Sequence, residues 1–302
     1  MGSLRRTVFG VIAGLGFLSA GWAQAPASWC NPVSNPVYND TAFLRGEISL
    51  VHAYQALPNQ VSTVGGKAAL DGDLNAFAVQ AEVPVSDCLS LVAIKSLYLD
   101  FNPDQTLSKE SGFIDLAAGL KLALVSQENY ACTLRTTVEF PTGDDDVFQG
   151  NGEGNVSPAL LFTWLNGNVG VNAAAGAVVP FNDAEESAVG YMSVGAAYRF
   201  TERLSTMLEV NWYRVLQEGD GDKNFDNQLP GLARVIDFEG GDLVNFGASN
   251  AESHADQVTA ALGLRYQVLD NANLGVAYEI PVTPEETGVM DYRVTTNLSL
   301  TF

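Results

Sequence analysis

Apolar and polar residues alternate along most of this chain, and the alternation is clearest at its end. The last stretch, DYRVTTNLSLTF, places apolar residues at almost every second position up to Phe302. A period of two is the mark of a β-strand with two unlike faces. The stretch therefore predicts a C-terminal strand with one apolar and one polar face.

Twelve stretches of the chain share this pattern. Most are longer than the five or six residues of an ordinary strand, and they match the ~9–11 residues that a tilted strand needs to cross a bilayer. The predicted strands cover residues 46–55, 75–85, 89–101, 113–126, 131–141, 155–165, 168–181, 187–200, 204–216, 255–269, 273–282 and 289–302.

The connections between these strands alternate in length. Short turns fall at 86–88, 127–129, 166–168, 201–203 and 270–272. Longer loops lie between them, the longest at about 217–254, so both chain ends fall on the short-turn side. This alternation of short and long connections is typical of a bacterial transmembrane barrel. A sheet that closes into a barrel leaves no free strand edge in lipid. The sequence therefore predicts an all-β fold, a transmembrane antiparallel up-and-down β-barrel of about 12 strands.

The N-terminus has the layout of a secretory signal peptide. Arg5 and Arg6 precede an apolar run over residues 8–20, and Ala23-Gln24-Ala25 is a small-x-small cleavage site. The run is too short to span a bilayer, so we expect residues 1–25 to be removed after export.

Residues 26–44, PASWCNPVSNPVYNDTAFL, carry two Asn-Pro steps and no clear period, so we expect an irregular conformation. Small residues on the inward parity of several strands leave room in the lumen. A barrel of twelve strands is larger than the barrels of about 8 strands that side chains fill, and smaller than those of about 16–18 strands that hold a water channel. The lumen is thus either a narrow pore or is occupied by residues 26–44, a periplasmic or plug segment, and residues 45–302 form the transmembrane barrel.

The formal net charge is −20, which argues against nucleic acid as a partner. If the apolar side of each strand faces outward, six acidic and six basic side chains face the lumen. They form either a structural salt-bridge network or a mixed-charge constriction that selects the solute. The acids are Glu47, Glu82, Asp115, Glu139, Glu209 and Glu279, and the bases are Lys95, Lys121, Arg135, Arg199, Arg265 and Arg293.

Enzyme chemistry and bound groups have little support in the sequence. The two histidines are His52, with an outward parity, and His254, which follows Ser253 at the rim. A barrel hydrolase needs a histidine beside a serine or acid, so we expect no enzyme and no cofactor. The loop residues Asp220, Asp222, Asn224 and Asp226 have calcium-loop spacing, but the turn glycine and the terminal glutamate are missing.

Two further sequence features concern the barrel's rims. Export to an oxidising compartment permits disulfides, and Cys30 and Cys88 are the pair we expect to be bonded, near the short-turn mouth. Aromatic residues at strand ends, among them Phe101 and Phe113 at the long-loop end, predict two interfacial girdles.

The stretch TTVEFPTGDDDVFQGNGEGNVSPALLFTW, residues 136–164, resembles the Pro-Thr-Gly-Asp, Gly-x-Gly and Pro-Ala-Leu pattern of an outer-membrane transporter family. That family is named for the phenol meta-cleavage pathway and is distantly similar to the long-chain fatty acid transporters. The resemblance implies uptake of small hydrophobic or aromatic compounds. This chain has fewer strands and a shorter N-terminal segment than the fatty acid transporters, which puts a lateral hydrophobic exit in doubt.

The expected function is passive uptake of small molecules through a channel in the bacterial outer membrane. A structural or surface-interaction barrel with a plugged lumen is the alternative, and a barrel hydrolase is a third. The expected partners are outer-membrane lipid and lipopolysaccharide, a small-molecule solute, and the barrel-assembly machinery. The last expectation follows because the terminal Phe302 resembles the C-terminal signature of outer-membrane barrels.

Overall fold

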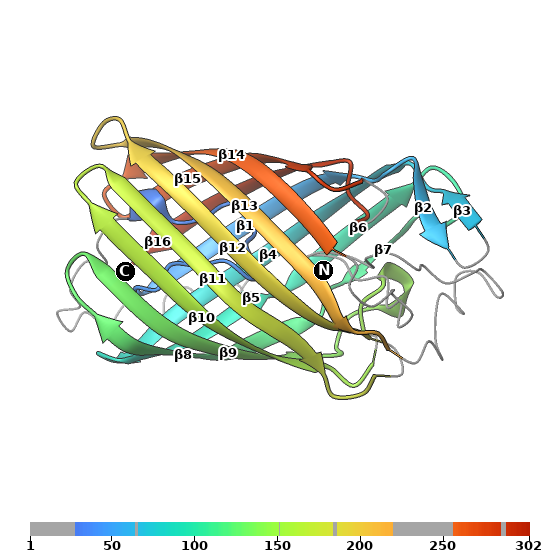
Figure 1. Cartoon of the computed structure of the whole chain (residues 1–302), viewed down its shortest axis with the longest axis horizontal. Helices are drawn as coiled ribbons and strands as arrows, with labels where there is room; N and C mark the ends of the chain where they lie inside the picture. Colours follow the sequence, from blue (N-terminus) through green and yellow to red (C-terminus); the bar gives the residue numbers. More distant parts are fainter. Residues whose placement is uncertain (1–27, 64–65, 151, 184–185, 220–255, 285–287) are drawn as a thin grey trace, which may run out of the picture.

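One antiparallel sheet that closes on itself dominates the computed structural model (Figure 1). The structure describes residues 28–63, 66–150, 152–183, 186–219, 256–284 and 288–302. The wall strands are β1 (Glu47–Ala56), β4 (Gly72–Ser86), β5 (Leu89–Lys95), β6 (Leu97–Pro103), β7 (Glu110–Phe113), β8 (Leu116–Ser126), β9 (Tyr130–Phe140), β10 (Asn155–Asn166), β11 (Val169–Pro180), β12 (Ala188–Arg199), β13 (Leu204–Gln217), β14 (Asp256–Leu269), β15 (Ala272–Pro281) and β16 (Tyr292–Thr301).

Strand β1 closes the barrel because it pairs on both of its edges. Leu50 lies opposite Leu298 of β16 on one side and opposite Val79 of β4 on the other. Strands β5 and β6 together take one place in the ring, and β7 and β8 take the next, which gives a closed barrel of 12 strands. The predicted fold class is confirmed, and among the described residues the short turns and the longer connections fall where the sequence placed them. Most of the longest predicted loop lies outside the described residues.

Two strands that were predicted as continuous are broken in the structure. The stretch 89–101 divides into β5 and β6 at Ser96, and 113–126 divides into β7 and β8 at Ile114 and Asp115. Strand β5 pairs with β8, and β6 pairs with β7. On the other side, the long strand β4 pairs with both β5 and β6. At the break, the Ser96 hydroxyl donates to the carbonyl of Val79 at 2.7 Å, so the interruption keeps its backbone partner satisfied.

A short hairpin, β2 (Gln60–Thr63) and β3 (Gly66–Ala69), extends beyond the long-loop end of the barrel (Figure 1). The sequence reading treated this connection only as a loop. Among the described residues, no helix has the length and apolar character needed to cross a membrane.

The outer face of the wall is apolar and the inner face is largely polar. In β10, buried and exposed residues alternate without interruption from Ser157 to Asn166. Outward residues such as Leu160, Leu208 and Leu262 are more than half exposed. An apolar belt of this extent on the outside of a closed barrel is the surface that faces lipid in transmembrane barrels.

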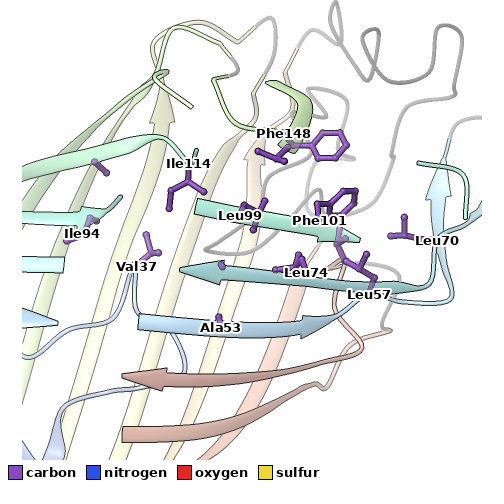
Figure 2. Close-up of a cluster of buried hydrophobic side chains, with 14 of the residues drawn as sticks. Val37, Ala53, Leu57, Leu70, Leu74, Ile94, Leu99, Phe101, Ile114 and Phe148 are labelled. Atoms are coloured by element: carbon purple, nitrogen blue, oxygen red, sulfur yellow. The ribbon is translucent and has the colours of Figure 1, made fainter. Parts of the chain in front are cut away.

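One part of the inner face departs from this rule. An apolar group at the long-loop end, the outer apolar cluster, faces inward from β1, β4, β6 and the loops above them (Figure 2). It includes Phe101, which is fully buried and packs edge-on against Phe148 with ring centroids 5.4 Å apart. The assignment of Phe101 to an interfacial girdle was therefore wrong, whereas Phe113 is 61% exposed.

The loop over residues 141–154 folds back over this cluster. It contains the short helix η3 (Asp145–Val147) and buries Val147 and Phe148. The carboxylate of Asp115 fixes the loop by accepting hydrogen bonds from the backbone N–H groups of Gly143 at 2.8 Å and Gly150 at 2.9 Å. Gly150 has a φ of +67°, a conformation that favours glycine. The Pro-Thr-Gly-Asp motif thus belongs to a loop that is held at the long-loop end of the barrel by hydrogen bonds to Asp115.

Candidate functional site

Residues 28–46 lie inside the barrel, where they contact β8, β10, β13 and β15, and they begin with the short helix η2 (Ser28–Cys30). Most side chains of this N-terminal segment are buried, including Val33, Ser34, Asn35 and Val37, each exposed by 3% or less. The lumen in this structure is therefore occupied by the chain's own N-terminal segment.

Strand β13 holds most of the first half of the segment, and β12 adds the Ser193 hydroxyl, which accepts from the Asn35 side chain at 3.1 Å. The carboxylate of Glu209 accepts hydrogen bonds from the backbone N–H of Val33 at 3.0 Å and from the hydroxyl of Ser34 at 2.9 Å. The side-chain amide of Asn35 donates to the Tyr213 hydroxyl at 2.8 Å. These partners come from the inward parity of β13, so one wall face anchors three successive residues of the segment.

The second half of the segment binds the neutral polar residues of β9 and β10. The hydroxyl of Thr163 accepts from the backbone N–H of Ala42 at 2.8 Å, and the hydroxyl of Thr133 donates to the Ala42 carbonyl at 2.5 Å. Both polar backbone groups of Ala42 are thus satisfied by the wall, as buried backbone requires.

Charged pairs tie the end of the segment to the opposite wall. The ammonium of Lys121 lies 2.9 Å from Asp40 and 2.8 Å from Glu82, and Arg45 contacts Asp40 at 3.0 Å and Glu47 at 2.9 Å. Burial alone would raise the pKa of Asp40, but Lys121 and Arg45 hold it well below its usual range. Asp40 and Arg45 belong to the segment itself, and the sequence reading did not single them out.

Small residues of the wall make room for the segment. A Cβ at Gly170 would lie 2.7 Å from the Cβ of Cys30, and a Cβ at Gly275 would lie 2.8 Å from a methyl group of Val33. A side chain at either position would push against the segment. The predicted use of small inward residues to leave space is thus realised, and the space is filled by residues 28–46.

The expected Cys30–Cys88 disulfide is absent from the structure, where all three cysteines are free thiols. Cys30 is buried against β11, whereas Cys88 is exposed in the turn between β4 and β5. Burial raises the pKa of the Cys30 thiol to about 11, so the reactive thiolate is scarce near neutral pH.

The twelve charged residues expected in the lumen all have inward or half-buried side chains. Ten are buried, and Glu139 and Arg199 are half-buried. Three pairs join members of the set, which are Lys95–Glu139 at 2.8 Å, Lys121–Glu82 at 2.8 Å and Arg293–Glu279 at 2.7 Å.

The remaining members of the set bind other groups. Arg135 donates to the Tyr38 carbonyl at 3.0 Å, and Arg265 donates to the Pro32 carbonyl at 3.2 Å. The guanidinium of Arg199 lies over the ring of Trp29 at 5.1 Å. The predicted charges thus bind mainly one another and the N-terminal segment, and a role as a solute-selecting constriction stays a prediction.

Sequence reasoning missed the neutral wall residues that hold the segment, such as Thr163, Ser193, Asn211 and Tyr213. Their signal was present in the alternation of each strand. Ser193 has the inward parity of Arg199, and Asn211 and Tyr213 have that of Glu209. Strand β10 has no charged residue, and Thr163 alternates there with outward apolar residues. The predicted lumen set contained charged residues, so these neutral residues were not part of it.

The other candidate sites gain no support from the described residues. His52 is half-buried, with its Nε2 3.2 Å from the Asn75 side-chain oxygen and its ring beside Phe77. Asp220, Asp222, Asn224, Asp226 and His254 lie outside the described residues. Within the described part of the chain, no group of three or more His, Cys, Asp or Glu side chains is placed to hold a metal ion.

Beside the N-terminal segment, the wall encloses a cavity of about 60 Å³. The segment lines one side of it, and strands β1, β4, β5, β9, β14 and β16 line the rest. A second, apolar cavity of about 10 Å³ lies between Val37, Ala53 and Ile94, which are members of the outer apolar cluster.

Residues 87–285 match the family described as "Putative MetA-pathway of phenol degradation". No curated protein sequence matches the chain. Among solved structures, the chain is similar to the COG4313 outer membrane channel from Pseudomonas putida F1, with 12% identity and a TM-score of 0.58, over 93% of this chain and 100% of the other. At that identity the likeness shows the fold alone.

Two further structures share the barrel more distantly. The NanC porin has 6% identity and a TM-score of 0.48, covering 84% of this chain and 98% of its own. A Pseudomonas aeruginosa FadL homologue has 11% identity and a TM-score of 0.35, covering 91% and 99%. Neither likeness adds to the functional argument.

Proposed function

The chain belongs to the family described as "Putative MetA-pathway of phenol degradation", and from this membership and the lumen geometry we propose a bacterial outer-membrane channel for small, largely apolar molecules. Aromatic compounds are the solute class that the family description favours. The described conformation is then a closed one, in which residues 28–46 fill the lumen.

The outer apolar cluster is the observation that carries this proposal. An aqueous pore has polar walls, yet at the long-loop end the inward side of the wall carries the buried side chains of Leu74, Leu99, Phe101 and their neighbours (Figure 2). Such apolar residues favour a solute whose transfer out of water costs little free energy. Ile94 and Val37 belong to the same cluster and line the small apolar cavity beside the N-terminal segment.

The test is uptake by intact Gram-negative cells that express the mature chain. We expect labelled phenol and toluene to enter faster than in cells without the barrel, and a sugar of similar size to enter no faster. Leu99→Asn places a polar group on the inward path and should lower uptake of the aromatic probes. Leu216→Asn makes the same change at an exposed position at the end of β13, and uptake should be unchanged. Faster sugar entry, with no gain for the aromatics, would contradict the proposal.

The alternative is a structural or surface-interaction barrel with a permanently plugged lumen. It is favoured by the number of wall residues that bind residues 28–46, among them Glu209, Thr163 and Lys121. Planar-bilayer recordings separate the two functions. If a variant without residues 28–44 conducts while the full mature chain neither conducts nor speeds uptake of any probe, the plugged barrel is the better description.

Residence in the outer membrane and the expected partners belong to the same proposal. The backbone N–H of Phe302 donates to the Gly46 carbonyl at 3.0 Å, so the last residue joins the first strand at the short-turn rim. Recognition of Phe302 by the assembly machinery predicts that Phe302→Ala slows barrel assembly in cells. A chelator should release lipopolysaccharide if divalent ions bridge it to the acidic outer loops.

A further inference from the structure

The cavity of about 60 Å³ between the N-terminal segment and the wall has an unusual set of lining charges. A water molecule needs roughly 10–15 Å³ measured in this way, so the space can hold several waters or one small ion with its hydration. Its charged lining residues are Asp40, Arg45, Glu47, Glu82, Arg135 and Arg265.

The acids of the cavity already have cationic partners. Asp40 and Glu82 both contact Lys121, and Glu47 contacts Arg45, at 2.8–2.9 Å. The three carboxylates share two bases in contact, Lys121 and Arg45, and together with Arg135 and Arg265 the group carries one net positive charge.

Arg135 and Arg265 are both at least 98% buried, and neither has a carboxylate within 4.0 Å among the described residues. Within the described part of the chain, Arg135 donates only to the Tyr38 carbonyl, and Arg265 donates to the Pro32 carbonyl and the Asn297 side-chain oxygen. Glu209, another carboxylate of the inner wall, is already bound by the backbone and hydroxyl groups of the segment. Two guanidinium charges thus face one cavity without a counter-charge in contact.

Several hydrogen-bonding atoms of the lining residues also lack a partner. They are the Nε of Arg135 and of Arg265, the Nη1 of Arg45, and both side-chain polar atoms of Asn39, which is 4% exposed. Arg45 Nε and Glu47 Oε2 also lack a hydrogen bond, although they lie 2.9 Å apart as an ion pair. Most of these atoms are donors. Buried donors without partners are costly and rare in folded proteins, and buried charges are normally paired.

We propose that this cavity binds one small oxoanion, either a carboxylate or an inorganic anion. The two guanidinium groups supply the charge and directed donors that such anions accept. Water can satisfy single donors but cannot balance the one net positive charge of this group, and a cation would add to that charge. The proposal goes beyond the proposed transport function, because binding can occur whether or not the barrel conducts.

The apolar part of the cavity defines two sources for the anion. Pro36, Val92 and Ile94 also line it, and the last two belong to the outer apolar cluster. A free inorganic anion would use the polar side alone. The carboxylate of an apolar acid such as benzoate would place its ring toward these three residues.

The experiment is isothermal calorimetry on the folded mature chain in detergent, in a sulfonate buffer at constant ionic strength. The probes are acetate, benzoate and inorganic phosphate. We expect saturable binding of at least one probe with a stoichiometry near one. Tighter binding of benzoate than of acetate identifies the apolar acid as the source, and phosphate binding without that preference identifies the inorganic anion.

Three variants test the position of the site. Arg265→Gln should weaken binding at least tenfold, and Arg214→Gln, which changes a half-exposed arginine paired with Asp256, should leave it unchanged. If Arg265→Gln does not fold, Asn39→Asp is the second test, because it supplies a carboxylate inside the cavity with almost no change of shape. We expect Asn39→Asp to fold and to lose anion binding.

Absence of saturable binding for all three probes in the folded wild-type chain would overturn the proposal. Equal binding in the wild type, Arg265→Gln and Asn39→Asp would also overturn it, because the anion would then bind elsewhere. Neither result bears on the uptake experiment, so the two proposals fail separately.

Discussion

Ser34 and Glu209 are 175 residues apart in the chain and meet in the middle of the barrel, where the Ser34 hydroxyl donates to the Glu209 carboxylate at 2.9 Å. The backbone N–H of Ser34 donates to the same carboxylate at 3.2 Å. Because Glu209 faces inward from β13 at a buried position, this contact fixes the N-terminal segment to the wall near its midpoint. It is the natural place to test how firmly the lumen is occupied.

Glu209→Ala should loosen the N-terminal segment. It removes a charged acceptor and leaves buried donors unpaired, which we expect to weaken the anchoring by about 3 kcal/mol, or roughly 100-fold in the population of the released segment. The measurement is maleimide labelling of Cys30 at pH 8 in a background with Cys88→Ser and Cys132→Ser. Burial raises the pKa of Cys30 to about 11, so labelling of the parent should be slow.

The matched control for this experiment is Glu128→Ala, which removes an exposed acid from the turn between β8 and β9. Its labelling rate should equal that of the parent. Equal rates in Glu209→Ala and the parent would mean that the Ser34–Glu209 contact does not hold the segment.

Occupation of the lumen should resist mild acid. Lys121 and Arg45 lower the pKa of Asp40, so its contribution to anchoring is fully present above its ordinary value of roughly 3.9 and is lost only as the pH falls through the lower folded-state pKa. Bilayer conductance of the mature chain should therefore be flat between about pH 7 and 5. A rise in conductance within that window would contradict this assignment.

Asp40→Asn tests the same ion pairs at neutral pH. Lys121 keeps its contact with Glu82 and Arg45 keeps its contact with Glu47, so we expect the anchoring to weaken by about 1.5–3 kcal/mol, the range for a hydrogen bond to a charged group. Cys30 labelling reports the effect. Asp104→Asn, which alters an exposed loop ion pair with Lys109, is the control and should change nothing.

Phe101 and Phe113 should differ sharply in their contribution to stability, although both were predicted to lie at the rim. Phe101→Ala removes a fully buried ring and should destabilise the barrel by about 3–5 kcal/mol. Phe113→Ala removes a ring that is 61% exposed and should cost less than about 1 kcal/mol. Urea unfolding in detergent micelles, followed by tryptophan fluorescence, measures both. Equal losses would mean that the outer apolar cluster does not pack tightly.

Asp115 should control the loop over residues 141–154. Asp115→Ala removes the acceptor for the N–H groups of Gly143 and Gly150, each bond to a charged group contributing about 1.5–3 kcal/mol. We expect hydrogen exchange at these two amides to become at least tenfold faster. Exchange rates that match those of the parent would show that the loop is held by its packing on Phe101 instead.

The amino-acid sequence by itself determined the wall of this protein. Period-two alternation fixes which residues of β10 or β13 face inward, because a strand places successive side chains on opposite sides. The alternation of short turns and long loops fixes the up-and-down order, and together these features predicted the barrel and the inward set that includes Glu209 and Arg265. The motif at 136–164 predicted the family, which the match over residues 87–285 confirms.

Only the tertiary structure decided what fills the barrel. Residues 28–46 have no period, so their path depends on partners such as Glu209 and Lys121 that lie far away in the chain. The expectation that the apolar residues of a strand face outward was wrong in β6, because Leu99 and Phe101 face inward while Asp100 and Asn102 do not. Above the lipid belt either face can be polar, so alternation identifies two faces there but not which one is buried.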